Sequence, residues 1–228
     1  MAAGDVLRSE APVAAHLRLL SVETAGAVEE AAAVLRAGGL VVFPTDTLYA
    51  LGADPLNGEA LRRLVRAKGS RGKAIPLLLP GPEALGEVAS EVPGLALVLA
   101  SQFWPGPLTL VVRARPGLPE VLTGGTGTVG VRVPAGPVAL GLLRTLGGPV
   151  TGTSANRTGE RAPRQVEDVA AEFAAHLDLL LDGGACPVGV PSTVLDLTTD
   201  PPCVRRIGAV PVAILRRMEG LQRLGEPA

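Results

Sequence analysis

The chain has 228 residues, of which 47% are hydrophobic and 19% are charged, and its formal net charge at pH 7 is −1. This composition excludes a disordered protein, and the near-neutral charge excludes a protein that binds polyanions through its overall charge. Aromatic residues make up only 2%, which argues against a nucleic-acid surface built on base stacking.

The counts of cysteine and histidine bound the chemistry further. Cys186 and Cys203 are too few for a disulfide framework, and His16 and His176 show no metal-ligand spacing. Charged residues interrupt the N-terminus, and no apolar run approaches the length of a membrane span. We therefore expect a cytoplasmic protein that binds no membrane.

Apolar periodicity, punctuated by glycine and proline, predicts the elements in chain order. Residues 1–20 are expected to form an N-terminal leader or an edge strand, and a helix capped by Thr24 is expected to end at Gly38-Gly39. Further helices are predicted over 58–67, 82–89, 94–103, 137–146, 165–175 and 211–219. Strands are predicted over 40–43, 75–79, 108–112, 129–133, 178–181, 193–197 and 203–206.

Helices and strands thus alternate along the whole chain. This order predicts an α/β or α+β protein built on a sheet. No internal repeat and no linker is evident, so we expect one domain over residues 21–218, followed by a C-terminal tail at 219–228.

The lysines are the most informative feature. The chain has nineteen arginines but two lysines, Lys68 and Lys73, and both lie in the hexapeptide KGSRGK at 68–73. Two compact ammonium groups beside the guanidinium of Arg71 in a short turn indicate a site for a small, highly charged anion such as a phosphate. Chance clustering is the alternative.

Polar side chains also cluster after the strand predicted at 40–43. Thr45, Asp46 and Thr47 follow it directly and precede Tyr49, the only tyrosine of the chain. A turn that satisfies its own backbone explains Asp46 and one threonine. It explains the tyrosine less well, so a binding role is the other interpretation, in which Asp46 supports the loop or contributes to metal binding.

Two more polar clusters stand beside strands. Ser154 and Asn156 follow a short stretch that we interpret as a buried strand, in the position where ligands of sheet proteins tend to bind. Ser192 and Thr193 stand where the strand at 193–197 begins, although threonine is also common in ordinary strands.

Arg132 lies within the strand predicted at 129–133. Alternation places Val129, Val131 and Val133 on one face of the sheet and Arg132 with Gly130 on the other. Glycine leaves room for a ligand beside the guanidinium. A solvated position on an edge strand is the alternative.

Two segments match known motifs by their letters alone. GTGTVG at 125–130 has the G-x-G-x-x-G spacing, but it leads into a strand, so it is not a dinucleotide fingerprint. GTSAN at 152–156 lacks the final glycine of a nucleophile elbow, and the one downstream histidine falls at the end of a predicted helix. No Walker loop exists, so any nucleotide has to be bound in another way.

Seven segments stand in a characteristic order: FPTDTLYALG (43–52), KGSRGKAIPL (68–77), WPGPLTLVV (104–112), TVGVRVP (128–134), TSAN (153–156), PSTVLDLT (191–198) and RRIGAV (205–210). Their order and spacing resemble the YrdC-type L-threonylcarbamoyladenylate synthases, over about residues 25–215. The resemblance implies a single-domain, YrdC-like fold with a large twisted mixed open sheet, flanking helices and a cationic concave cleft.

The resemblance implies a nucleotidyltransferase that converts L-threonine, bicarbonate and ATP, with Mg²⁺, into L-threonylcarbamoyl-AMP and pyrophosphate. This product supplies the threonylcarbamoyl group of t6A at position 37 of tRNAs that read ANN codons, and a separate transferase complex attaches it.

The same resemblance implies roles for individual residues. The catalytic pair would be Lys68 and Arg71. ATP or the adenylate would contact Lys68, Arg71, Lys73, Thr128, Ser154, Asn156 and Arg206. L-threonine would contact Thr45, Thr47, Tyr49, Arg132, Ser192 and Thr193. No residue is assigned to a metal.

The chain departs from the family pattern in several places. Arg71 stands three positions after Lys68, where the family has arginine after two, and the loop is one residue shorter. Leu78 stands where many relatives carry a histidine near threonine, so we expect that contact to be missing. Ala50 replaces the glycine after Tyr49. The chain is also too short for the extra C-terminal domain of longer relatives.

Two other functions remain open at this stage. A non-catalytic module for tRNA or rRNA maturation would use the cationic concavity to hold an RNA backbone, although the near-neutral charge and the few aromatics count against it. A related paralogue would act on another carbamoyl substrate.

Overall fold

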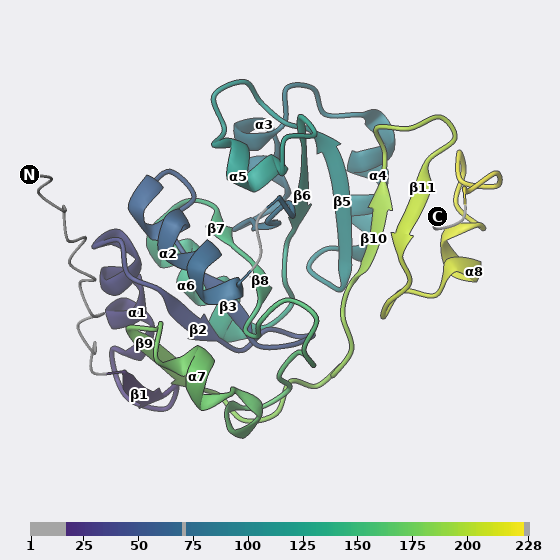
Figure 1. Ribbon diagram of the computed structural model, residues 1–228. Coiled ribbons are helices and arrows are strands. Elements are labelled where there is room, and N and C mark those ends of the chain that lie inside the picture. Colours follow the sequence, from purple (N-terminus) through teal and green to yellow (C-terminus); the bar gives the residue numbers. More distant parts are fainter. Residues whose placement is uncertain (1–16, 70–71, 226–228) are drawn as a thin grey trace, which may run out of the picture.

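The computed structural model describes residues 17–69 and 72–225 (Figure 1). Its strands form two mixed sheets, with strand orders β1-β9-β2-β3-β8 and β11-β10-β5-β6-β4-β7. The strands are β1 Arg18–Ser21, β2 Val41–Phe43, β3 Ala50–Gly52, β4 Leu77–Leu78, β5 Leu108–Arg113, β6 Thr128–Arg132, β7 Val150–Thr151, β8 Thr153–Ser154, β9 Leu179–Asp182, β10 Thr193–Asp196 and β11 Cys203–Arg206.

Helices flank both sheets (Figure 1). Each of the longer ones buries an apolar stripe, and α1 packs against α6. The helices are α1 Ala27–Arg36, α2 Gly58–Lys68, α3 Leu85–Val88, α4 Gly94–Phe103, α5 Glu120–Thr123, α6 Pro137–Leu146, α7 Ala171–Ala174 and α8 Val212–Leu215, with 3-10 turns η1 Pro82–Ala84 and η2 Val166–Asp168.

The two sheets meet where β7 runs into β8. The N–H of Thr151 donates to the carbonyl of Ala53 at 3.1 Å, and the N–H of Ala53 donates to Thr151 Oγ1 at 2.8 Å. Gly152 is the residue at which the chain passes from one sheet to the other. A Cβ there would lie 2.4 Å from Leu78 Cγ, so glycine is needed for this crossing.

The predicted α/β class, with mixed pairing and flanking helices, is confirmed, and the strands divide between two sheets. Most predicted elements also form, but three details of the helices were wrong. Helix α1 begins at Ala27 after a left-handed Gly26, so Thr24 is not its cap. The helix predicted over 165–175 is broken into η2 and α7 by extended backbone at Val169, and α8 is a single turn.

The ends of the predicted domain pack against the body. Residues 1–16 of the predicted leader lie outside the described residues, whereas Arg18–Ser21 forms the edge strand β1 beside β9. Leu221 and Leu224, within the predicted tail, are buried in the larger hydrophobic core. The domain boundaries themselves stay predictions. No helix in the described part of the chain combines the length and apolar character that a membrane crossing requires.

Candidate active site

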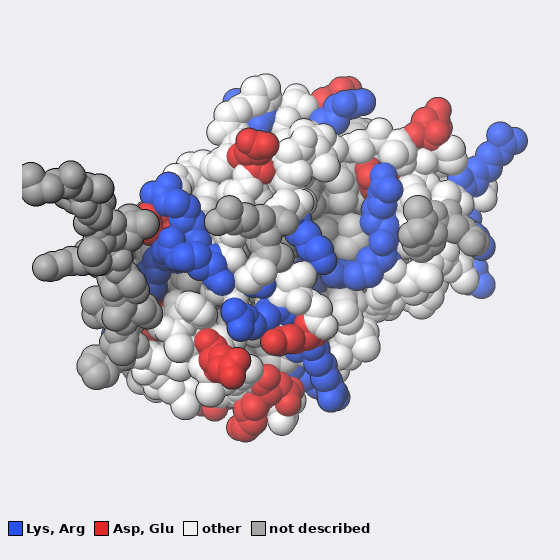
Figure 2. Space-filling model, in the orientation of Figure 1, with Lys and Arg blue, Asp and Glu red and all other residues white. Residues whose placement is uncertain are grey.

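Two adjoining cavities open between the sheets. The first, of about 640 Å³, is lined from both sheets and includes Arg132 and Ser192. The second, of about 1020 Å³, includes Lys68 and Asn156. Both share a wall made of Ala74, Thr153, Ser154 and Arg206. The two cavities are therefore neighbouring parts of one hollow, and Figure 2 shows Lys and Arg side chains around it.

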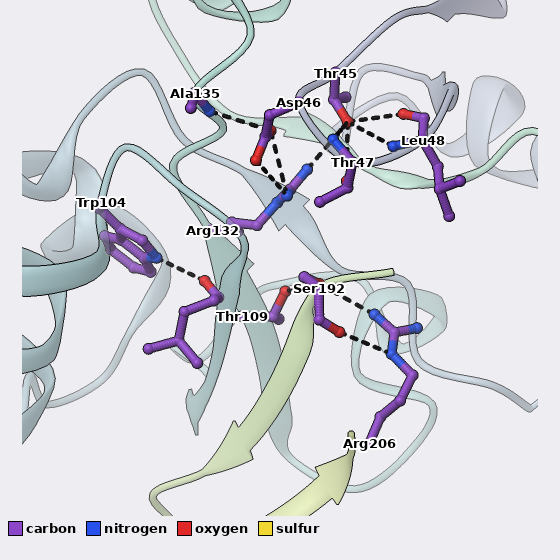
Figure 3. A network of polar contacts seen from close by, with 11 residues as sticks. Thr45, Asp46, Thr47, Leu48, Trp104, Thr109, Arg132, Ala135, Ser192 and Arg206 are labelled. Atoms are coloured by element: carbon purple, nitrogen blue, oxygen red, sulfur yellow. Dashed lines mark hydrogen bonds and ion pairs between the residues drawn. The ribbon is translucent and has the colours of Figure 1, made fainter. Parts of the chain in front are cut away.

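Arg132 is a buried cation on the floor of the first cavity. Strand β6 lies between β5 and β4, and only 5% of Arg132 is exposed, so the edge-strand alternative is excluded. Its Nη1 lies 3.4 Å from both carboxylate oxygens of Asp46, and its Nη2 lies 3.4 Å from Thr45 Oγ1 (Figure 3). These contacts are long for charge-assisted hydrogen bonds, which leaves the guanidinium able to bind a further anion.

Burial and charge act in opposite directions on Arg132. Burial lowers the pKa of the guanidinium, and the neighbouring carboxylate of Asp46 partly opposes this shift. Asp46 is itself buried and accepts the N–H of Ala135 at 3.1 Å. Asp46 therefore supports the loop and orients Arg132.

The turn after β2 brings two hydroxyls to the same floor. Thr45 Oγ1 donates to the carbonyl of Leu48 at 2.7 Å and accepts the N–H of Thr47 at 3.1 Å. Thr45 and Thr47 both line the first cavity, and their hydroxyls are 3.0 Å apart. The turn thus satisfies its own backbone and also presents hydroxyls beside Arg132. The binding role of this segment stays a prediction.

Ser192 connects the floor to the shared wall. Its Oγ lies 2.8 Å from Thr109 Oγ1 and accepts from Nη2 of Arg206 at 3.1 Å, while Nε of Arg206 donates to the Ser192 carbonyl at 3.0 Å (Figure 3). Arg206 therefore borders both cavities while anchored to Ser192. Sequence reasoning missed Thr109, although its place between buried Leu108 and Leu110 could have marked a cavity-facing hydroxyl.

Gly208 fixes the position of Ser192 by close backbone contact. A Cβ at Gly208 would lie 2.4 Å from the carbonyl oxygen of Pro191 and 2.5 Å from that of Ser192. We expect Gly208→Ala to lower the free energy of unfolding by roughly 1–3 kcal/mol, because backbone has to shift. Chemical denaturation measures this loss. Gly86→Ala is the matched control, since a Cβ there meets nothing within 4 Å; equal stability of the two variants would contradict the contact.

Lys68 ends α2 at the second cavity. Its Nζ donates to the carbonyls of Ser154 and Asn156, both at 2.6 Å, and 9% of the residue is exposed. An ammonium group has three donors, and acceptors among the described residues take two of them, so within this part of the chain the third is left for a ligand. Burial lowers the pKa of Lys68 to about 8; the charge of Glu160 raises it, and that of Lys73 lowers it further.

Asn156 carries an unsatisfied acceptor beside Lys68. Its Nδ2 donates to the carbonyls of Arg157 and Glu160 at 2.8 Å each, whereas its buried Oδ1 has no partner among the described residues. A buried oxygen without a donor costs free energy unless a ligand supplies one. The second cavity thus combines a cation with an open acceptor.

Two further predicted contacts line the hollow. Lys73 is exposed and lines the second cavity, and Thr128 lines the first, with its Oγ1 at 2.8 Å from Thr126 Oγ1. Arg71 lies outside the described residues. Leu78 lines the first cavity with an apolar side chain.

Two predicted contacts turn their hydroxyls away. Thr193 is fully buried, its Oγ1 donates to the carbonyl of Val210 at 2.7 Å, and it does not line either cavity. Tyr49 lines the first cavity, but its hydroxyl donates to the carbonyl of Gly184 at 2.8 Å and accepts the N–H of Gly183 at 3.1 Å. Burial raises the pKa of Tyr49 to about 12. Both hydroxyls hold loops together.

Asp196 and Arg205 also line the first cavity, although sequence reasoning placed neither of them in the site. No group of three His, Cys, Asp or Glu side chains in residues 17–69 and 72–225 is arranged to hold a metal ion.

Comparisons with known proteins agree with this geometry. The Sua5/YciO/YrdC family model, described as "Telomere recombination", matches residues 33–208. A threonylcarbamoyl-AMP synthase of Pyrococcus abyssi is 41% identical over 196 residues, which are 85% of this chain and 57% of that protein. One of Bacillus subtilis is 37% identical over 186 residues, which are 80% of this chain and 54% of that protein.

The fold is also similar to that of a solved structure. P. abyssi Sua5 in complex with L-threonine matches with a TM-score of 0.85 and 37% identity, over 91% of this chain and 62% of that chain. This chain therefore spans a little more than half the length of these relatives.

Proposed function

Because this chain belongs to the Sua5/YciO/YrdC family, we propose that it is an L-threonylcarbamoyladenylate synthase. It combines L-threonine, bicarbonate and ATP into L-threonylcarbamoyl-AMP, pyrophosphate and water. The threonine amine takes up bicarbonate or CO₂ to give a carbamate. A carbamate oxygen then attacks the α-phosphorus of ATP, and pyrophosphate leaves.

The observation that carries this proposal is the wall shared by two cavities that each contain a buried cation. Arg132 lines one cavity, Lys68 lines the other, and Ser154 and Arg206 border both. The reaction needs an amino acid and a nucleoside triphosphate held side by side. Two pre-aligned reactants can lower a barrier by about 7–11 kcal/mol through positioning alone.

The first cavity suits the amino acid. Arg132 offers a planar fork to the threonine carboxylate, and Asp46 keeps that fork oriented. Thr45, Thr47 and Ser192 supply hydroxyls around it for the polar groups of threonine. We retain these residues as threonine contacts and leave out Thr193, because it lines neither cavity and its hydroxyl is bound to Val210.

The second cavity and the shared wall suit the phosphates. Carbamate and triphosphate are both anions, so their repulsion has to be compensated by cations in a site of low dielectric. Lys68, Lys73 and Arg206 supply positive charge there, and we add Arg71 on the resemblance alone. Ser154 and Asn156 complete the proposed contacts to ATP or the adenylate, together with Thr128 on β6.

Mg²⁺ would accompany ATP as part of the substrate. The ion usually keeps several waters and binds through phosphates with one or two carboxylates. The cavity carboxylates of Asp46 and Asp196 are already engaged by Arg132 and Arg205. The described residues therefore do not fit a metal held by the protein, and no step is assigned to one.

The chemistry of the family also leads us to propose bicarbonate and a transferase complex as partners. Bicarbonate supplies the carbamoyl carbon, a transferase complex passes the group on to tRNA, and the reaction takes place in the cytoplasm.

One experiment tests the proposed function directly. The protein is incubated with ATP, bicarbonate and L-threonine, and mass spectrometry looks for the adenylate. Other amino acids in the same assay test a paralogue with another substrate. RNA binding with a steep salt dependence and no threonine-dependent ATP consumption would favour the RNA module instead.

Nucleotide binding is expected to depend on the charge of Lys68. Because its pKa is lowered from 10.5 to about 8, the ammonium form is lost as the pH rises through 8. We expect the affinity for a non-hydrolysable ATP analogue to fall roughly fivefold between pH 8 and pH 9. Calorimetry without threonine measures this, so the threonine amine cannot contribute.

The Lys68→Arg variant is the control, because arginine stays charged across this range. Its affinity should be independent of pH, whatever its absolute value. The free energy of unfolding depends on pH in the opposite direction. Below pH 8 the buried charge of Lys68 destabilises the fold, and this penalty is lost as the pH rises from about 8 to 10.5. A wild-type affinity that stays constant to pH 9.5 would refute the role.

A further inference from the structure

A β-bulge turns two consecutive arginines toward the same side of the sheet. Val194 pairs with Arg206 and Leu195 pairs with Val204, so Arg205 has no residue of its own opposite it on β10. In a regular strand, neighbouring side chains face opposite sides. Here both arginines line the first cavity. Bulges are known to re-aim side chains in this way beside active sites.

The two arginines differ in how their charge is compensated. Nε and Nη2 of Arg205 lie 3.0 and 2.9 Å from Oδ2 of Asp196, whose carboxylate is 7% exposed. The other oxygen, Oδ1, accepts the N–H and the hydroxyl of Thr198 at 2.8 and 2.6 Å. Arg206 instead donates to the neutral oxygens of Ser192. Arg205 thus forms a nearly neutral pair, whereas Arg206 keeps its charge.

The guanidinium of Arg205 remains open to the cavity. The side chain is 49% exposed, although two of its nitrogens are held by Asp196. Fixing Nε and Nη2 fixes the plane of the whole group, because the guanidinium is rigid. Arg205 therefore presents the flat face of a guanidinium with a fixed orientation to the first cavity.

Asp196, the partner of Arg205, belongs to a row of paired residues that crosses the sheet. Asp196 pairs with Val111, and Val111 pairs with Gly130, so these three residues form one row across three strands. All three line the first cavity. Gly130 lies two residues from Arg132 on β6, which is about 6.7 Å along the strand. The row therefore lies next to Arg132, the proposed contact of the threonine carboxylate.

The described residues that line the two cavities offer no exposed aromatic ring for stacking. Among the described lining residues of both cavities, Tyr49 is the only aromatic one, and its ring is fully buried with its hydroxyl bound to Gly183 and Gly184. A nucleotide base in the hollow thus needs another planar partner, and a guanidinium plane stacks well on such rings.

We infer that Arg205, held flat by Asp196, stacks on the base of the bound nucleotide, while Arg206 contacts its phosphates. This assignment rests on the proposed function, because it requires a nucleotide in the first cavity. A compensated guanidinium has little attraction left for a phosphate, whereas its face still suits an uncharged heteroaromatic ring. Two arginines that are adjacent in the sequence thereby bind different parts of one nucleotide, Arg205 the base and Arg206 the phosphates.

Two ligands separate these roles: a non-hydrolysable ATP analogue and inorganic triphosphate, which has no base. Calorimetry gives the affinity of each for the wild type and for Arg205→Gln, Arg205→Lys and Arg206→Gln. Both Arg205 variants are expected to bind the analogue roughly tenfold to a hundredfold more weakly, the range of a lost base-stacking contact. Their affinity for triphosphate should stay within about twofold of the wild type. Arg206→Gln should weaken both ligands.

Arg205→Lys keeps a cation beside Asp196, so it guards against misfolding, and thermal unfolding of each variant checks this. Unchanged binding of the analogue by the Arg205 variants would overturn the inference, as would an equal loss for triphosphate. If the wild type made the adenylate normally in either case, the proposed function would stand and only this assignment would fall. A wild type that binds no nucleotide would overturn both.

Discussion

Lys68→Ala is expected to lower L-threonine-dependent pyrophosphate release at least roughly a hundredfold. Lys68 places a largely buried ammonium at the second cavity, where the triphosphate and the carbamate both bring negative charge. Loss of one preorganised electrostatic contact in such a site costs about a hundredfold to a thousandfold in rate. A coupled pyrophosphate assay at saturating ATP and threonine measures the effect.

The same lysine also holds the loop at 154–156, so the structural part of the loss has to be separated. Its Nζ bonds to the carbonyls of Ser154 and Asn156. Lys73→Ala serves as the matched control, because Lys73 lines the same cavity but is exposed, and its contribution should be smaller. Thermal unfolding of both variants shows whether the fold is kept. Near-normal turnover by Lys68→Ala would remove this residue from the mechanism.

Arg132→Ala is expected to weaken L-threonine binding about thirtyfold or more, with little change in nucleotide affinity. Removing a buried charged partner of a carboxylate costs at least about 2 kcal/mol of binding free energy. Calorimetric titration with L-threonine measures the loss directly. Unchanged threonine affinity would refute the assignment of Arg132 to the carboxylate.

This variant also leaves Asp46 buried without its counterion, at a cost of roughly 3–5 kcal/mol of stability. The double variant Arg132→Ala/Asp46→Asn removes that uncompensated charge. We expect it to regain much of the stability but none of the threonine affinity. Recovery of both would mean that Arg132 acts on binding only through the fold.

Local patterns predicted most of the longer elements. The spacing of Leu61 and Leu64 in α2, and the alternation of Val129 and Val131 around Gly130 in β6, follow from burial of one face. The strands that escaped prediction, β3 and β8, are three and two residues long. Such strands owe their existence to partners far away in sequence, which no local pattern contains.

The site shows the same division. Burial of Arg132 with Gly130 on the cavity face follows from alternation, and polar residues at strand ends do gather at one hollow. The sequence could not predict that Arg205 faces the cavity, because the bulge depends on the register of β11 against β10. The hydroxyls of Tyr49 and Thr193 point elsewhere because backbone groups of distant loops bind them. Family resemblance supplied residue types but not these orientations.

The hydroxyl of Ser192 has a thermodynamic consequence for the two substrates. It receives a hydrogen bond from Arg206 at 3.1 Å and lies 2.8 Å from Thr109, between the floor and the shared wall. A phosphate that draws Arg206 toward itself frees this oxygen for the amino acid below. Each substrate must then alter the affinity for the other by an equal factor, since linkage between two ligands on one protein is reciprocal.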